Sequence, residues 1–196
     1  MARASVFKIV PKESSSFPLV ISSSIVDASI AKSLEYSLNK GESRKGLQLD
    51  VTINADGFEL EDVILSTLSS THFAFSQKAL DILIRLTTNS IETIPFTITK
   101  ESQSLPYYFI NVLTVLEALD TENTKWVRPE ERDSSNHPIL NIAIPALRSS
   151  VVAYIPLFLL KVKSDISSGL YISSNLKTAF EEANITGIEF KEIKTL

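Results

Sequence analysis

Two histidines are the residues best suited to acid–base chemistry in this 196-residue chain, which contains no cysteine. His72 and His137 are far apart in the sequence, so a metal site or a general base would need the fold to bring one of them to carboxylates. A serine hydrolase needs a serine on a sharp turn, near a histidine and a carboxylate. Ser76 and Ser173 show no such pattern and fit helix caps better. We therefore predict no catalytic residue, metal site or cofactor.

Charge and hydropathy exclude several other classes of protein. The chain has 19 basic and 23 acidic residues, and its net charge of −4 has the wrong sign for binding nucleic acid through phosphates. The longest apolar run, Val151 to Leu160, is half the roughly twenty residues that a membrane helix needs, and it contains Pro156. No secretion signal is recognisable near the start. We therefore expect a cytoplasmic protein with no nucleic-acid or membrane partner.

The clearest local pattern is near the C-terminus, from Leu170 to Ile193. A short apolar run precedes Ser173, whose hydroxyl suits a helix N-cap. Leu176, Ala179, Phe180 and Ala183 then follow at helical spacing and form one apolar stripe. Gly187 and the alternating residues after it predict a turn and a strand. This segment should therefore form a β-α-β unit.

A shift of 97 residues places a second segment of the same kind over the first. Ser76 then falls on Ser173, and Ala79, Ile82, Leu83 and Leu86 fall on the four stripe positions. The strand after the helix keeps its register, although identities are few. Leu80 and Ile84 should make this helix the more buried of the two. We predict two related β-α-β units, at 73–96 and 170–193.

The residues of the C-terminal unit also carry a family resemblance. The chain reads SSNLK from Ser173 and TGIEF from Thr186, which resembles the closing signature "SxxLKxAxExAxxTGxEF" of the immunity family numbered eleven in bacterial polymorphic-toxin systems. Tyr107 to Leu113 and Asp62 to Ile64 are similar to further pieces of that family, in the same order. The resemblance covers about the C-terminal two-thirds of the chain. It implies a cytoplasmic protein that binds and neutralises a cognate toxin.

A candidate partner surface lies in the charged segment from 120 to 137. Trp126, the only tryptophan, stands there among charged residues, and aromatic and arginine residues dominate binding hot spots. Acidic residues at the rim of such a surface steer basic partners. The alternative is that Trp126 folds back onto the core as a lid. The predicted partner-binding residues are Trp126, Arg128, Glu130, Glu131 and Asp133, with the acidic patch at Asp56 to Asp62 as the next candidate.

We therefore predict an α+β fold with a mixed β-sheet and few helices. The chain should be a single immunity-type domain over 1–196, with two lobes at approximately 1–100 and 101–196. The predicted function is stoichiometric binding of a cognate protein toxin, without catalysis. Two alternatives are a hydrolase-like enzyme with a site assembled around His72 or His137, and a structural scaffold module. Whether the chain forms a homo-oligomer is left open by the sequence.

Overall fold

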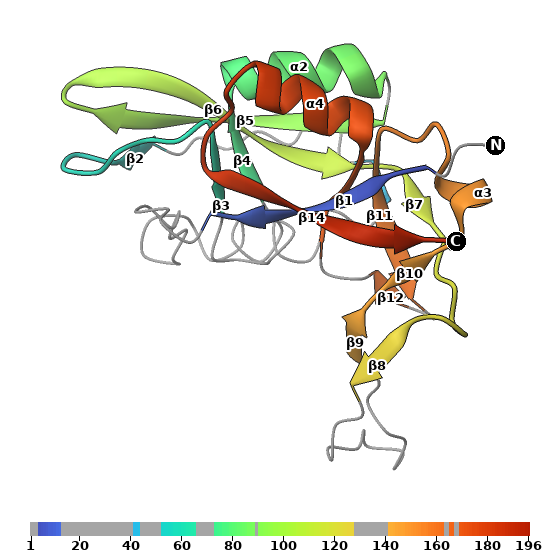
Figure 1. The fold of residues 1–196 in the computed structure, drawn as a ribbon. Coiled ribbons are helices and arrows are strands. Elements are labelled where there is room, and N and C mark those ends of the chain that lie inside the picture. The colour runs from blue at the N-terminus through green and yellow to red at the C-terminus, as the bar shows by residue number, and fades with distance from the viewer. Residues whose placement is uncertain are drawn as a thin grey trace.

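The structure is a computed structural model that describes residues 4–12, 41–43, 52–65, 73–88, 90–127, 141–162, 165–166 and 169–196 (Figure 1). Its strands are β1 (Val6–Pro11), β2 (Thr52–Asn54), β3 (Val63–Leu65), β4 (Phe73–Ser76), β5 (Ile91–Lys100), β6 (Gln103–Val112), β7 (Val115–Leu116), β8 (Lys125–Val127), β9 (Asn141–Ile144), β10 (Ala146–Leu147), β11 (Leu157–Val162), β12 (Asp165–Ile166), β13 (Tyr171–Ser173) and β14 (Ile188–Thr195). Its helices are α2 (Gln77–Thr87), α3 (Ser149–Val152) and α4 (Ser174–Glu182).

The first sheet contains the first predicted β-α-β unit. Its strand order is β2-β5-β6-β4-β3. β6 lies between β5 and β4 and is antiparallel to both, so β4 and β5 are parallel and α2 connects them. At the two edges, β2 pairs with β5 in parallel and β3 pairs with β4 in antiparallel orientation.

The second sheet repeats this arrangement around the second unit. Its order is β10-β14-β1-β13-β11-β12, and β7 also pairs with β11. β1 lies between β14 and β13 and is antiparallel to both, while α4 connects these two parallel strands. β10 pairs with β14 in parallel, and β11 pairs with β13 in antiparallel orientation. The five strands β10-β14-β1-β13-β11 therefore match the five strands of the first sheet, with β1 in the place of β6.

The two sheets also correspond in register. Ile91 lies opposite Val112 in the first sheet, and Ile188, 97 residues after Ile91, lies opposite Pro11 in the second. Three backbone hydrogen bonds that flank the first sheet each have an equivalent in the second sheet. Those of the first sheet run from Leu113 N to Ser90 O, from Ser76 N to Asp62 O and from Ala55 N to Thr99 O. Their equivalents, in the same order, run from Lys12 N to Gly187 O, from Ser173 N to Pro156 O and from Ser149 N to Leu196 O. We propose that the units at 73–96 and 170–193 arose by duplication.

Neither sheet is built from one half of the chain alone. β1 precedes every other described strand and joins the second sheet, whereas β6 follows residue 100 and joins the first. The predicted lobes at 1–100 and 101–196 therefore do not coincide with the sheets. We propose that the lobes follow the sheets instead, with β2 to β6 in one and β1, β7 and β10 to β14 in the other.

The helices form where their caps and apolar stripes predict them. The hydroxyl of Ser76 accepts a hydrogen bond from the amide of Ala79 at 3.3 Å, and Ser173 accepts one from Leu176 at 3.4 Å. α2 and α4 lie side by side over both sheets (Figure 1). Their stripes pack on the sheets in one shared core, whose buried members include Phe73, Phe75, Leu83, Ile110, Leu157, Ile172, Leu176 and Phe180.

The predicted fold class is confirmed, because the chain is α+β with mixed sheets and few helices. Two further apolar clusters lie on the faces of the sheets that point away from the helices. Phe96 and Phe109 stack in the cluster of the first sheet at 4.8 Å between ring centroids, and Phe158 and Tyr171 stack in that of the second at 5.5 Å. None of the helices in the described residues has the length and apolar character needed to cross a membrane.

Candidate functional site

Trp126 lies in β8, which pairs with β9 in a two-stranded hairpin. The hairpin projects below the second sheet, on the side opposite α2 and α4 (Figure 1). The indole Nε1 of Trp126 donates a hydrogen bond to the backbone carbonyl of Thr121 at 3.3 Å, and the residue is half-buried. This bond holds the indole at the base of the hairpin while part of its surface stays accessible.

A cleft of about 540 Å³ opens beside Trp126. Its volume lies within the range of small-ligand pockets, and it is also large enough for a side chain of a protein partner. The cleft is built by segments that are distant in the sequence, because β7, β10 and β11 end near it and β8 contributes Trp126. The described lining residues are Glu117, Leu119, Thr121, Trp126, Arg148, Lys161 and Val162.

The charged residues of this lining interact with one another through an ion pair and a hydrogen bond. Lys161 Nζ forms an ion pair with Glu117 Oε1 at 2.7 Å, and the guanidinium of Arg148 donates a hydrogen bond to the backbone carbonyl of Glu117. The hydrogen bond from Lys161 and its charge lower the pKa of Glu117, so this exposed carboxylate stays ionised at neutral pH. Both cations approach Glu117, and the described lining carries one more positive than negative charge.

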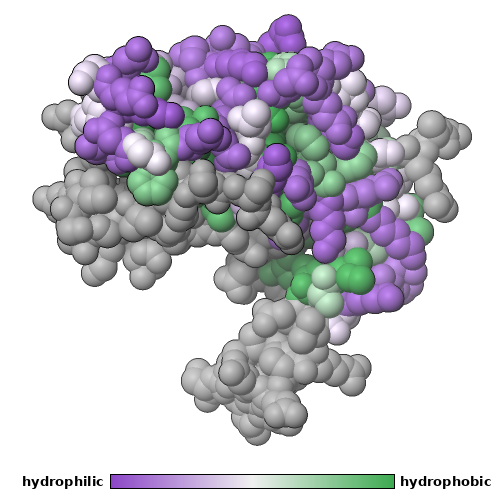
Figure 2. All heavy atoms as spheres, turned by 60° about the vertical axis from the view of Figure 1, so that its left-hand side comes forward, coloured by the Kyte–Doolittle hydropathy of each residue, from purple (hydrophilic) through white to green (hydrophobic). Residues whose placement is uncertain are grey.

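Apolar side chains continue from the cleft onto the hairpin. Ile144 of β9 lies opposite Lys125, next to Trp126, and it is 48% exposed. Ala143 is exposed as well. Figure 2 shows hydrophobic residues gathered at the level of the hairpin, whereas hydrophilic residues dominate the helix side. An indole, an exposed isoleucine and fixed charges together make a surface suited to binding a protein.

The structure places only part of the predicted site. Trp126 lines the cleft, whereas Arg128, Glu130, Glu131 and Asp133 lie outside the described residues, as do His72 and His137. Sequence reasoning missed the charged lining residues Glu117, Arg148 and Lys161. Each of these is a single charge near the end of a short strand, a pattern too common to indicate a site.

Two of the sequence motifs meet away from the cleft, where the segments before β3 and β14 touch. The amide of Val63 donates to the carbonyl of Thr186 at 3.1 Å. The carboxylate of Asp62 accepts hydrogen bonds from Ser76 Oγ at 2.9 Å and from the amide of Thr186 at 3.2 Å, and it pairs with Lys78 Nζ at 3.3 Å. This Asp62 cluster (Asp62, Ser76, Lys78 and Thr186) joins the two sheets. These motif residues therefore hold the fold together.

Tyr107, close to this cluster, makes the stability of the fold depend on pH. Its hydroxyl donates to the carbonyl of Glu61 at 2.7 Å, and burial, followed by the charges of Asp62 and Glu61, raises its pKa to about 12. An unfolded tyrosine titrates near 10, so between about pH 10 and 12 the folded chain holds a proton that the unfolded chain has lost.

We expect the free energy of unfolding to fall as the pH rises through this interval. Below it, the stabilisation from neutral Tyr107 is fully present. Urea unfolding across the interval measures the slope for the parent chain and for Tyr107→Phe, which cannot ionise. A smaller slope in the variant is expected, and equal slopes would contradict the assignment.

A comparison with known proteins places these motifs in a family. The sequence model of an immunity protein family (Imm11) matches residues 55–195, which is well over half of the chain and includes every described residue of the cleft. Among curated proteins, none matches this sequence. The match spans the Asp62 cluster, β6 and the complete second β-α-β unit. By this match, the chain belongs to the Imm11 immunity protein family.

Proposed function

We propose that this chain binds a cognate protein toxin and neutralises it by stoichiometric protein–protein interaction, without catalysis. The observation that carries the proposal is the family match over residues 55–195. The surface that supports it best is the cleft beside Trp126, because it combines a half-buried indole with fixed charges and an exposed apolar hairpin. We place this activity in the bacterial cytoplasm, within a polymorphic-toxin system.

The remaining predicted partner residues extend this proposal. Arg128, Glu130, Glu131 and Asp133 follow β8 directly in the sequence. We propose that they belong to the same binding surface, where acidic side chains at the rim set the association rate with a basic partner. A surface on a projecting hairpin can vary in sequence without disturbing the sheets, which suits a protein matched to a single toxin.

The proposal is tested with a candidate toxin, chosen as a protein whose gene lies next to the gene of this chain. The purified chain should form an equimolar complex with it, measured by size-exclusion chromatography with light scattering. Co-expression of the two proteins should restore growth that the toxin alone prevents. Absence of both the complex and the protection would overturn the proposed function.

Replacing the indole should weaken this complex. We expect Trp126→Ala to cost about 2 kcal/mol of affinity or more, since central aromatic anchors contribute most at protein interfaces. Titration calorimetry measures the loss, and circular dichroism checks the fold. Tyr154→Ala is the matched control, because Tyr154 is 99% exposed in a loop before β11 and does not line the cleft. Equal affinity of the Trp126→Ala variant and the parent chain would move the interface away from the cleft.

A further inference from the structure

Two lysines lie directly opposite each other on the second sheet. Lys8 of β1 pairs in register with Lys191 of the antiparallel strand β14. Val6 and Ile193, two residues along each strand, belong to the apolar cluster on the face away from the helices. Because side chains alternate along a strand, Lys8 and Lys191 project from that same face. We refer to them below as the lysine pair.

Lys8 is held in a confined setting. It is half-buried, and its stem lies across the chain at Gly169, where a Cβ atom would come within 2.4 Å of Lys8 Cε. Burial, followed by the charge of Lys191, lowers the pKa of Lys8. The ion pairs found in the described part of the chain are Lys78–Asp62, Lys161–Glu117 and Lys177–Glu181. Within that part, neither member of the lysine pair has a carboxylate at ion-pair distance.

The first sheet carries apolar residues at the two positions that correspond to the lysine pair. The register places Ile94 opposite Phe109 there, at the places of Lys191 and Lys8. Both residues are 1% exposed, and both belong to an apolar cluster. The second sheet thus carries two cations where the first carries a packed apolar pair. Like charges directly opposite on neighbouring strands are destabilising, so the fold gains nothing from this difference.

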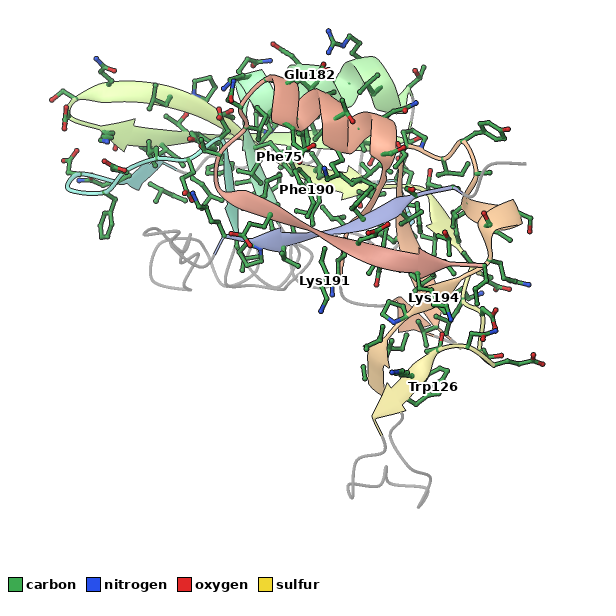
Figure 3. All side chains as sticks on the ribbon, in the orientation of Figure 1. Phe75, Trp126, Glu182, Phe190, Lys191 and Lys194 are labelled. Atoms are coloured by element: carbon green, nitrogen blue, oxygen red, sulfur yellow. The ribbon has the colours of Figure 1, made fainter. Side chains whose placement is uncertain are left out.

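The lysine pair lies on the same side of the molecule as the candidate site. Figure 3 shows Lys191 pointing away from α4, below β14, and Trp126 on the hairpin that projects below the same strand. A partner that reaches from the cleft toward β14 would therefore meet the lysine pair.

We propose that Lys8 and Lys191 form a cationic subsite that receives carboxylate side chains of the bound toxin, an inference that rests on the proposed function. A bound carboxylate would relieve the repulsion between the two ammonium groups and would restore the solvation that Lys8 lost on burial. The partner should therefore present an acidic segment to this face.

The chemistry of the face favours protein carboxylates over a free phosphate. β1 is paired on both sides, to β13 and to β14, so its backbone amides are used within the sheet. Among the described residues, the lysine pair thus offers two ammonium groups without a glycine-rich loop or a helix terminus on its face, the usual partners of phosphate. A free anion that binds here loses its translational and rotational entropy and gains only these two contacts. A carboxylate on a protein that is already docked makes the same contacts at little further entropic cost.

The test compares the parent chain with the double variant Lys8→Met, Lys191→Met, which keeps an unbranched apolar stem at both positions and removes the two ammonium groups. We expect the affinity for the toxin to fall by roughly tenfold or more, with a weaker dependence on salt. The melting temperature should stay equal or rise, because the repulsion is removed and no ion pair between described residues is lost. Lys100→Met, at the tip of the hairpin of β5 and β6, is the control and should change neither affinity nor salt dependence. The single variant Lys191→Met, at an exposed position, repeats the test with the smallest change to the fold.

The outcomes separate this inference from the proposed function. Failure of the parent chain to bind the toxin would overturn both. Normal binding by the double variant, alongside weakened binding by Trp126→Ala, would overturn the lysine subsite alone. Inorganic phosphate that binds the parent chain by calorimetry, but not the double variant, would overturn the assignment to protein carboxylates.

Discussion

Gly187→Ala is expected to lower the free energy of unfolding by about 4 kcal/mol or more, an amount close to the whole stability of many domains. Gly187 has φ +90°, a conformation that strains a residue with a Cβ atom. An added Cβ would also meet the backbone carbonyl oxygen of Val63 at 1.9 Å. That oxygen belongs to a strand, so neither side can move without opening the junction between the two sheets. Guanidinium unfolding followed by circular dichroism measures the loss.

Gly57 provides the matched control, because its φ of +82° is similar and nothing lies within 4 Å of the added Cβ. Gly57→Ala carries only the conformational strain, which costs about 1 kcal/mol. The difference between the two variants therefore isolates the close approach of Gly187 to β3. Equal losses in the two variants would show that the contact with Val63 contributes nothing beyond the backbone conformation.

Asp62→Ala is expected to cost about 3 kcal/mol, because it removes an acceptor shared by three groups at once. The side chain of Asp62 is 17% exposed, and its loss leaves the amide of Thr186 and the hydroxyl of Ser76 without this acceptor. Lys78 loses its ion pair as well. The substitution therefore weakens the junction between the sheets and the start of α2 together. Thermal and urea unfolding should both report the change.

Asp81→Ala is the comparison for this prediction. Asp81 lies on the exposed side of α2 and accepts a hydrogen bond from the side chain of Gln77 at 2.7 Å. Its removal should change stability by less than about 0.5 kcal/mol, as is usual for exposed pairs on a helix. If Asp62→Ala were as mild as Asp81→Ala, the Asp62 cluster would not join the sheets as inferred.

Local pattern was sufficient to predict the elements of the two β-α-β units. Serine caps and apolar stripes depend on residues within one helix, so they can be read from a short window. Leu80 is buried as expected, with 2% of its surface exposed, and α2 has more buried residues than α4. Ile84, however, is 52% exposed, because it points away from the stripe that faces the sheets. An apolar residue type alone does not fix the face on which it lies.

The arrangement of the strands could not be predicted in the same way. β1 lies between β13 and β14, and no residue near it in the sequence indicates partners so far along the chain. The cleft depends on the same long-range pairing, since Glu117, Arg148 and Lys161 come together only when β7, β10 and β11 are in place. The lysine pair could not be predicted without the strand register, because nothing in the sequence around Lys8 or Lys191 distinguishes them from other lysines.

The position of β1 also determines when the protein can finish folding during synthesis. Strands of the first sheet can pair once residues 52–112 have left the ribosome, whereas Val6 must wait for Ile193. Closing so long a loop is slow compared with forming a hairpin. A surface built on the second sheet is therefore complete only when translation has passed β14. Until then β1 lacks its partner β14, and each newly made molecule completes this sheet with a delay set by the length of the chain.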